Sequence, residues 1–274
     1  MQEELAMTMK KSLTLAGSDA SGGAGMAADL KTFQEYDVYG MTALTSIVTM
    51  DPKGWSHNVT PIDVDIVGKQ LDTILSVGVD TMKSGMLGSV DIIKLGAKKI
   101  DEYNIDKYVL DPVMVCKGED EVLQPENTDA MRDYLLPRSF VTTPNLFEAG
   151  QLAQTGPLKT IEDMKEAAIK IHELGAKNVV IKGGKALDHE EAIDLFYDGH
   201  EFEILKRDKV DTTYNHGAGC TFAAAITANL AHGKSVKESV FAAKDFVTAA
   251  IANGWKLNEY VGPVMHGAYN KVTN

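Results

Sequence analysis

Short β-type runs alternate with helical runs along most of this chain, and the alternation limits the folds that it can adopt. Strands are predicted over residues 12–16, 43–49, 81–83, 108–110, 140–143 and 178–182, and helices over residues 26–36, 66–75, 90–100, 162–174, 221–231 and 236–252. Strands that alternate with helices form largely parallel sheets covered on both faces. We therefore expect an α/β fold with a doubly wound, mostly parallel sheet.

One region departs from this alternation. Residues 193–197 and 201–205 both read as strands and flank the dipeptide Asp198-Gly199, which is a hairpin signal. A small antiparallel edge is therefore expected. The chain has 274 residues, 44% of them hydrophobic, and no evident linker or internal repeat. We predict a single domain over residues 1–274, in which residues 1–11 form a disordered or extended N-terminal segment.

Composition and charge argue against several classes of partner. The formal net charge is −12, and no cluster of lysine and arginine alternates with aromatic residues, so nucleic acid and anionic membrane are not expected as partners. Residues 1–7 contain acids and lack the basic start and apolar run of a signal peptide, and no stretch approaches a membrane span. A cytoplasmic protein is expected, in which Cys116 and Cys220 are free thiols outside any zinc-binding spacing.

The segment from Tyr214 to Phe222 places a Gly-x-Gly turn before a long helix of small apolar residues. Helix starts leave backbone N–H groups unpaired and carry the positive end of the helix dipole, and Gly217 and Gly219 leave room for a phosphate. A thiol at such a position has its pKa lowered from about 8.5, which would make Cys220 a base. The alternative is an ordinary turn followed by a buried cysteine.

Polar groups follow five of the predicted strands. They lie in Gly17-Ser18-Asp19, Lys83-Ser84-Gly85-Met86, Asp111-Pro112-Val113-Met114, Thr143-Pro144-Asn145 and Lys182-Gly183-Gly184. Ligands bind open α/β sheets outside the carboxyl ends of the strands, so these groups are expected to converge on one site. The glycine-rich loop at residues 17–25 matches neither the Rossmann nor the P-loop pattern. It can bring backbone close to a small ligand, with Asp19 as a ligand contact or as a helix cap.

Several of these residues have two interpretations. Asn145 and Glu148 share the first turn of a helix, where they can hold Mg²⁺ through water or simply cap the helix, and Asp111 is similarly ambiguous. Lys182 can reach a phosphate or extend from a strand end. Cys116 lies in a polar stretch that we interpret as a flap over the site.

Taken together, these motifs resemble one family over almost the whole chain. Residues 16–25, Asp111-Pro112-Val113-Met114, Thr143-Pro144-Asn145-x-x-Glu148-Ala149, Lys182-Gly183-Gly184 and His216-Gly217-Ala218-Gly219-Cys220-Thr221 resemble the ribokinase superfamily, specifically its hydroxymethylpyrimidine kinase and pyridoxal kinase branch. The resemblance runs from about residue 12 to residue 269. Sugar kinases of the superfamily carry an aspartate base where this chain has Cys220, which marks the vitamin kinase branch.

Two departures from the usual hydroxymethylpyrimidine kinase pattern narrow the resemblance to the pyridoxal kinases of this branch. Met50 stands where hydroxymethylpyrimidine kinases usually carry a ring-binding glutamine, and Cys116 looks like the lid thiol of the dual-cysteine pyridoxal kinases. In those enzymes the lid thiol forms a hemithioacetal with the 4′-aldehyde. The resemblance thus implies transfer of the ATP γ-phosphate to the 5′-hydroxyl of pyridoxal or a related hydroxymethyl heterocycle.

The resemblance also implies a role for each site residue. For catalysis it implies Cys220 as base, Cys116 as aldehyde-capturing thiol, and an anion hole formed by Gly217, Ala218 and Gly219. For ATP it implies Lys182, Gly183 and Asn145, and for Mg²⁺ it implies Glu148, Asn145 and Asp111. The residues implied at the substrate are Ser18, Asp19, Gly25, Met50 and His57. From its neighbours alone His57 reads instead as a surface-loop residue. The family is typically dimeric, and a monovalent cation is an open requirement.

Three alternatives stay open at the level of sequence. The first is a hydroxymethylpyrimidine kinase of thiamine synthesis, or an enzyme that phosphorylates both rings. The second is a non-catalytic nucleotide or vitamin binder on a kinase scaffold. The third is a redox-responsive protein in which Cys116 and Cys220 pair as a disulfide.

Overall fold

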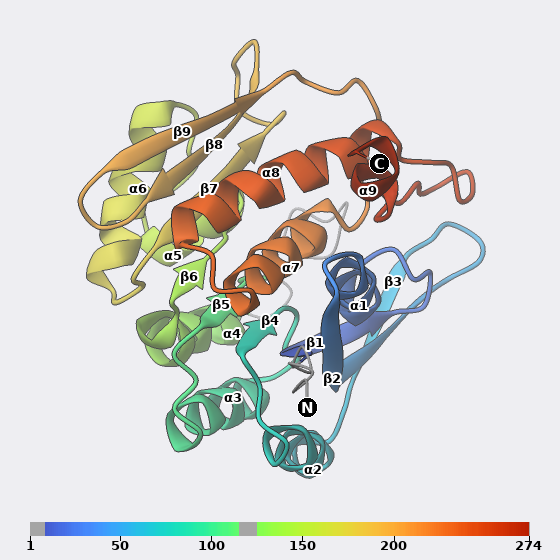
Figure 1. Ribbon diagram of the computed structural model, residues 1–274, viewed down its shortest axis with the longest axis vertical. Coiled ribbons are helices and arrows are strands. Elements are labelled where there is room, and N and C mark those ends of the chain that lie inside the picture. Colours follow the sequence, from blue (N-terminus) through green and yellow to red (C-terminus); the bar gives the residue numbers. More distant parts are fainter. Residues whose placement is uncertain (1–8, 115–124, 274) are drawn as a thin grey trace, which may run out of the picture.

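The computed structural model describes residues 9–114 and 125–273, which form a mixed sheet between two layers of helices (Figure 1). The strand order within the described residues is β3-β2-β1-β4-β5-β6-β7-β8-β9. The strands are β1 (Lys10–Asp19), β2 (Val38–Met50), β3 (His57–Pro61), β4 (Thr81–Ser84), β5 (Tyr108–Leu110), β6 (Val141–Thr142), β7 (Val179–Gly184), β8 (Ala192–Tyr197) and β9 (Phe202–Arg207).

The central strands of this sheet are parallel and its edges are antiparallel. β2, β1, β4, β5, β6 and β7 pair in parallel, whereas β8 and β9 form the predicted antiparallel hairpin. The sequence analysis did not anticipate β3, which pairs antiparallel with β2 at the other edge. The predicted α/β fold, with a mostly parallel sheet and an antiparallel edge, is thus confirmed.

Helices cover both faces of the sheet. One face carries α1 (Gly25–Glu35), α7 (Ala218–Ala231), α8 (Val236–Ala252) and the short α9 (Ala268–Thr273). The other carries α2 (Val64–Leu75), α3 (Val90–Glu102), α4 (Pro125–Ala130) with the π- and 3₁₀-turns that follow it, α5 (Leu146–Ala153) and α6 (Ile161–Glu173). No helix among the described residues is both long enough and apolar enough to span a membrane.

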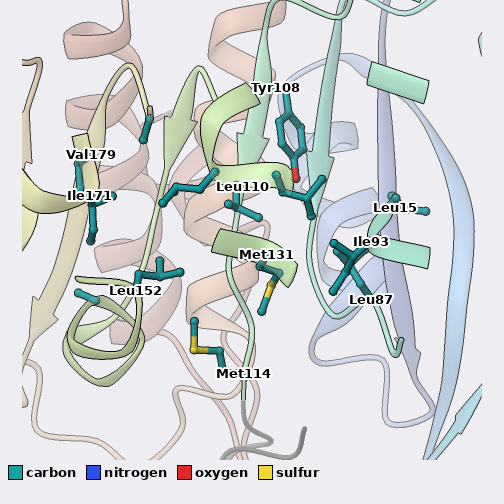
Figure 2. Packing of buried hydrophobic residues seen from close by; sticks show 14 of the residues in the cluster. Leu15, Leu87, Ile93, Tyr108, Leu110, Met114, Met131, Leu152, Ile171 and Val179 are labelled. Atoms are coloured by element: carbon teal, nitrogen blue, oxygen red, sulfur yellow. The ribbon is translucent and has the colours of Figure 1, made fainter. Parts of the chain in front are cut away.

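Each face of the sheet has its own apolar core, because successive strand residues point in opposite directions. In β5, Tyr108 and Leu110 join the core beneath α2, α3, α5 and α6, which Figure 2 shows from close by. Val109 lies between them and packs instead against α7 and α8. All three residues are fully buried, which explains why this strand reads as a continuous hydrophobic run.

Helix α7 is the innermost helix. Every residue from Thr221 to Ala231 is buried, and most of these side chains are small, so α1 and α8 both pack closely against it. The helix begins at Ala218, three residues before the predicted start, and its N-terminus lies at the carboxyl-end side of the sheet. This packing fixes the direction in which the positive end of the helix dipole points.

Candidate active site

A cavity of about 400 Å³ lies at the carboxyl ends of β1, β4 and β5, where the strand order reverses. It brings together most of the residues predicted from the sequence. These are Ser18, Asp19, Gly25, His57, Asp111, Asn145, Glu148, Lys182, Gly217, Ala218, Gly219 and Cys220. The prediction that the strand ends converge on one site therefore agrees with the geometry.

A second cavity of about 320 Å³ adjoins the first. The two cavities share Asn145, Lys182, Asn215, Ala218 and Gly219 as lining residues. Beyond this shared wall, the second cavity is lined by apolar residues of α7 and α8, such as Phe222, and by the buried ion pair of Lys244 and Asp194. This pair was not predicted from the sequence, because its two members lie 50 residues apart and meet only through the fold.

The turn before α7 is shaped to receive an anion. Gly217 is the N-cap residue with φ 82°, no side chain caps the helix, and its first turn carries no acid. The Ala218 N–H donates to the Asn215 carbonyl at 3.2 Å, so the helix offers a ligand the later N–H groups of its first turn and the positive end of its dipole. Gly219 lies close to Lys182, since a Cβ added at Gly219 would stand 3.4 Å from Lys182 Nζ. We refer to residues 217–220 as the anion turn.

Cys220 lies at the N-termini of two helices, not one. It belongs to the first turn of α7, and the backbone N–H of Gly25, the first residue of α1, donates a hydrogen bond to it. Its thiol is free. The expectation of a lowered pKa is nevertheless wrong. Burial raises the pKa of Cys220 to about 11 and outweighs the opposing effects of Lys83 and the Gly25 N–H.

A row of alternating charges lies beneath the anion turn. Lys83 Nζ lies 3.0 Å from both carboxylate oxygens of Asp29 and 3.9 Å from Asp111, and Asp111 in turn accepts a hydrogen bond from Lys182 at 2.9 Å. Burial disfavours a charged Lys83, but Asp29 and Asp111 outweigh it and raise the pKa of the ammonium. The sequence analysis placed Lys83 at a strand end without giving it a role, and it missed Asp29 entirely.

Asn145 and Glu148 form a capping box at the start of α5. Asn145 Oδ1 accepts from the Glu148 N–H and Glu148 Oε2 accepts from the Asn145 N–H, both at 2.8 Å. The capping alternative is thus realised, although Asn145 also lines both cavities and Glu148 lines the first. Burial raises the pKa of Glu148 to about 7, with Lys182 opposing and Asp111 reinforcing the shift.

The carboxylates of Asp111 and Glu148 offer the hard oxygen ligands that Mg²⁺ prefers. The described residues contain no group of three or more His, Cys, Asp or Glu side chains placed to hold a metal ion. Mg²⁺ usually takes one or two protein carboxylates and completes its shell with water and substrate phosphates. The residues present therefore fit a magnesium ion that arrives with a phosphate ligand.

Two predicted residues, Met50 and Gly183, do not line the cavities. Met50 ends β2 opposite His57 and does not line either cavity, whereas Val48, two residues earlier, does. Gly183 packs under β8, and it is Gly184 that faces the second cavity. Cys116 lies outside the described residues. His57 opens β3 and faces the cavity, so its interpretation as a surface-loop residue is wrong.

Comparison with known proteins places this geometry in a family. The model of the family described as phosphomethylpyrimidine kinase matches residues 19–265. The pyridoxine kinase of Bacillus subtilis is 59% identical over 264 residues, which cover 96% of this chain and 97% of that protein.

Two solved structures of the Staphylococcus aureus pyridoxal kinase each cover 97% of this chain and 96% of theirs. The complex with ADP is 60% identical with a TM-score of 0.94, and the complex with AMP-PCP and pyridoxal is 58% identical with a TM-score of 0.93. The predicted membership of the hydroxymethylpyrimidine and pyridoxal kinase branch of the ribokinase superfamily is therefore confirmed, and the chain belongs to the phosphomethylpyrimidine kinase family.

Proposed function

We propose that this kinase transfers the γ-phosphate of ATP to the 5′-hydroxyl of pyridoxal and so forms pyridoxal 5′-phosphate. The observation that carries the proposal is the wall shared by the two cavities, which includes Ala218 and Gly219 of the anion turn together with Lys182. An acceptor in one cavity and a nucleotide in the other would meet at a helix N-terminus. A similar kinase from Staphylococcus aureus has been solved with AMP-PCP and pyridoxal bound together, which supports this assignment of two ligands.

In the proposed reaction the cavity at the ends of β1 and β4 holds the heterocycle, and the cavity beside α8 holds the nucleotide. The 5′-oxygen attacks the γ-phosphorus in line, the bond to the bridging oxygen of ADP breaks, and the hydroxyl proton passes to Cys220. The N–H groups of the anion turn and the ammonium of Lys182 stabilise the charge that develops on the transferred group. Asn145 is assigned to the nucleotide side.

The raised pKa of Cys220 changes how its role as base must be understood. At neutral pH the thiol is almost entirely protonated, so only a small thiolate population can accept a proton. That thiolate is a stronger base than an ordinary one, because basicity rises with the pKa of the conjugate acid. The Gly25 N–H and Lys83 are the groups that favour it.

The lid thiol of Cys116 is proposed to capture the aldehyde. Its sulfur would add to the 4′-carbon, and the thiol proton would end on the former carbonyl oxygen, which gives a hemithioacetal. Mg²⁺, held by Asp111 and Glu148, would neutralise phosphate charge. We assign the reaction to the cytoplasm. A homodimer and a requirement for a monovalent cation stay predictions.

The experiment is a comparison of pyridoxal, pyridoxine, pyridoxamine and hydroxymethylpyrimidine as acceptors of ³²P from γ-labelled ATP, with and without Mg²⁺. We expect labelled pyridoxal phosphate, and we expect its loss when EDTA removes the metal. Nucleotide binding without transfer to any of the four acceptors would instead identify a non-catalytic binder. A count of free thiols with and without reductant tests the disulfide alternative.

A hydroxymethylpyrimidine kinase is the second candidate. The chain's membership of the phosphomethylpyrimidine kinase family favours it. The presence of Cys116 favours pyridoxal, whereas Met50, which stands in place of the usual glutamine, lines neither cavity and does not decide between the rings. Preferential labelling of hydroxymethylpyrimidine in the same assay would reverse our order of preference, and equal labelling would indicate an enzyme for both rings.

A further inference from the structure

A hydrogen bond joins the two glycine-rich segments that form the cavity. His216 Nε2 lies 2.6 Å from Asp19 Oδ2, although the two residues are 197 positions apart in the chain. Both side chains are about nine-tenths buried at the cavity wall. From the sequence, Asp19 was expected to contact the substrate, and His216 had no role beyond its place in a motif.

The carboxylate of Asp19 is already occupied by the protein. One oxygen accepts the N–H of Ser21 at 2.8 Å, and the other accepts the N–H of Ala24 at 2.9 Å in addition to the His216 contact. Burial alone would raise the pKa of Asp19, but the hydrogen bonds from His216 and Ser21 outweigh it and lower the pKa to about 2. Asp19 is therefore an ionised carboxylate that shapes its own loop.

The backbones of the same two segments are in direct contact. A Cβ at Gly217 would stand 1.8 Å from the carbonyl oxygen of Gly23, and a Cβ at Gly23 would stand 2.5 Å from the ring of His216. The Gly25 N–H reaches Cys220 across the same junction. A small movement of either segment would therefore displace the thiol relative to the loop.

His216 is also held from a third direction. Its N–H donates to the Gly262 carbonyl and its own carbonyl accepts from the Val264 N–H, both at 3.1 Å. The C-terminal segment thus holds the backbone of the histidine in place. Its partner Asp19 then sets where the glycine-rich loop lies relative to the anion turn.

We infer that His216 and Asp19 act as a positioning pair, which holds the glycine-rich loop against the anion turn so that the acceptor hydroxyl, Cys220 and the transferred phosphate are aligned. This inference rests on the proposed phosphoryl transfer. In this role Asp19 does not contact the substrate ring. Each of the two residues acts by holding the other in place.

The test is a double-mutant cycle of His216→Gln and Asp19→Asn with pyridoxal and pyridoxine as substrates. Each single variant is expected to lower kcat about 10- to 100-fold for both substrates, since misplacement by about 1 Å costs up to 10²-fold, while KM for ATP changes little. The double variant should be no slower than the slower single variant, because either change already breaks the contact.

His266→Gln is the matched control. His266 is 7% exposed, as is His216, but it does not line either cavity. A general loss of stability from replacing a buried histidine would affect both variants alike. We expect near-normal kcat for His266→Gln, and an equal loss in both variants would overturn the inference.

Two further outcomes would overturn it. One is multiplication of the two single effects in the double variant. The other is a raised KM for pyridoxal in Asp19→Asn alone, with His216→Gln normal, which would make Asp19 a direct ring contact. A second readout, independent of turnover, is the alkylation rate of Cys220 in a Cys116→Ser background. His216→Gln and Asp19→Asn should change that alkylation rate by a similar factor, even if pyridoxal proves not to be the substrate.

Discussion

Lys182 Nζ lies 2.9 Å from Asp111 Oδ1, at the place where the two cavities meet. Asp111 also has Lys83 at 3.9 Å on its other side. If Lys182 turns towards a bound phosphate, Asp111 therefore keeps a positive neighbour. The cost of leaving a buried carboxylate unpaired, which often makes such a movement unfavourable, is reduced here.

This relationship predicts the effect of Lys182→Met. Loss of the ammonium should lower kcat about 10²- to 10³-fold, as removal of a group that stabilises transition-state charge typically does. Lys177→Met is a suitable control, since Lys177 is an exposed lysine just before the same strand. Steady-state kinetics with varied ATP would decide. Similar kinetics in the two variants would show that Lys182 has only a structural role at Asp111.

Replacement of the proposed base should affect every acceptor. Cys220→Ala is expected to slow phosphorylation of pyridoxal, pyridoxine and hydroxymethylpyrimidine by about 10²- to 10⁴-fold, the usual effect of losing a general base. Nucleotide binding, measured by calorimetry, should be retained. A variant with near-normal kcat on all three acceptors would reduce Cys220 to a packing residue.

The pKa of Cys220 can be measured directly in Cys116→Ser, which leaves a single thiol in the chain. Burial raises this pKa from 9.0 to about 11, so the proton is retained until the pH approaches the higher value. At pH 8 the thiolate fraction is then about 100-fold lower than for an ordinary thiol, and alkylation by iodoacetamide should be slower by about that factor. The same variant unfolded in guanidinium supplies the reference rate. A folded-state midpoint below 8.5 would show that the two helix termini dominate after all.

Cys116 should matter for one substrate only. A thiol adds reversibly to the aldehyde of pyridoxal but not to the alcohol of pyridoxine, so Cys116→Ala should lower pyridoxal turnover far more than pyridoxine turnover. Parallel kinetics with the two substrates provide the comparison within one variant. An equal loss with both substrates would mean that Cys116 shapes the site without covalent capture. Unchanged pyridoxal turnover would rule out covalent capture of the aldehyde by Cys116.

The two ends of α7 offer a matched pair of glycines. Gly217 and Gly233 have φ 82° and 83°, yet a Cβ at Gly217 would meet backbone at 1.8 Å and a Cβ at Gly233 would meet nothing within 4 Å. Gly233→Ala should destabilise the protein by about 1–2 kcal/mol through its backbone conformation. Gly217→Ala should lose roughly 1–3 kcal/mol more through the clash and should lose activity as well. Urea denaturation of both variants tests this, and equal midpoints would contradict it.

Local signals in the sequence explain why much of the site was predictable. The strand ends that carry Asp111, Asn145 and Lys182 converge because parallel strands deliver their carboxyl ends to one edge, and period and turn residues reveal those strands. The anion turn was recognisable because Gly217 caps an apolar helix and Gly219 lies in its first turn. The family resemblance then added roles that the residues alone left open.

What the sequence did not reveal depends on distant partners. Asp29 lies within a helix and Lys83 within a strand, and neither position has a local pattern that announces a buried ion pair. The pKa of Cys220 was misjudged because the helix terminus is a local feature, whereas burial is a property of the packed fold. Strand β3 was missed because its five residues, His57–Pro61, alternate weakly and end in proline, which is typical only of an edge strand.

The wall shared by the two cavities has a practical consequence for inhibitor design. A compound that carries a pyridine ring at one end and adenosine at the other, joined by a phosphate chain that crosses Ala218 and Gly219, would fill both cavities at once. Such a molecule loses its translational freedom only once for two sets of contacts, and the second end binds at the high effective concentration set by the linker. The length of the phosphate chain that gives the tightest binding would then measure the distance over which the phosphate is transferred.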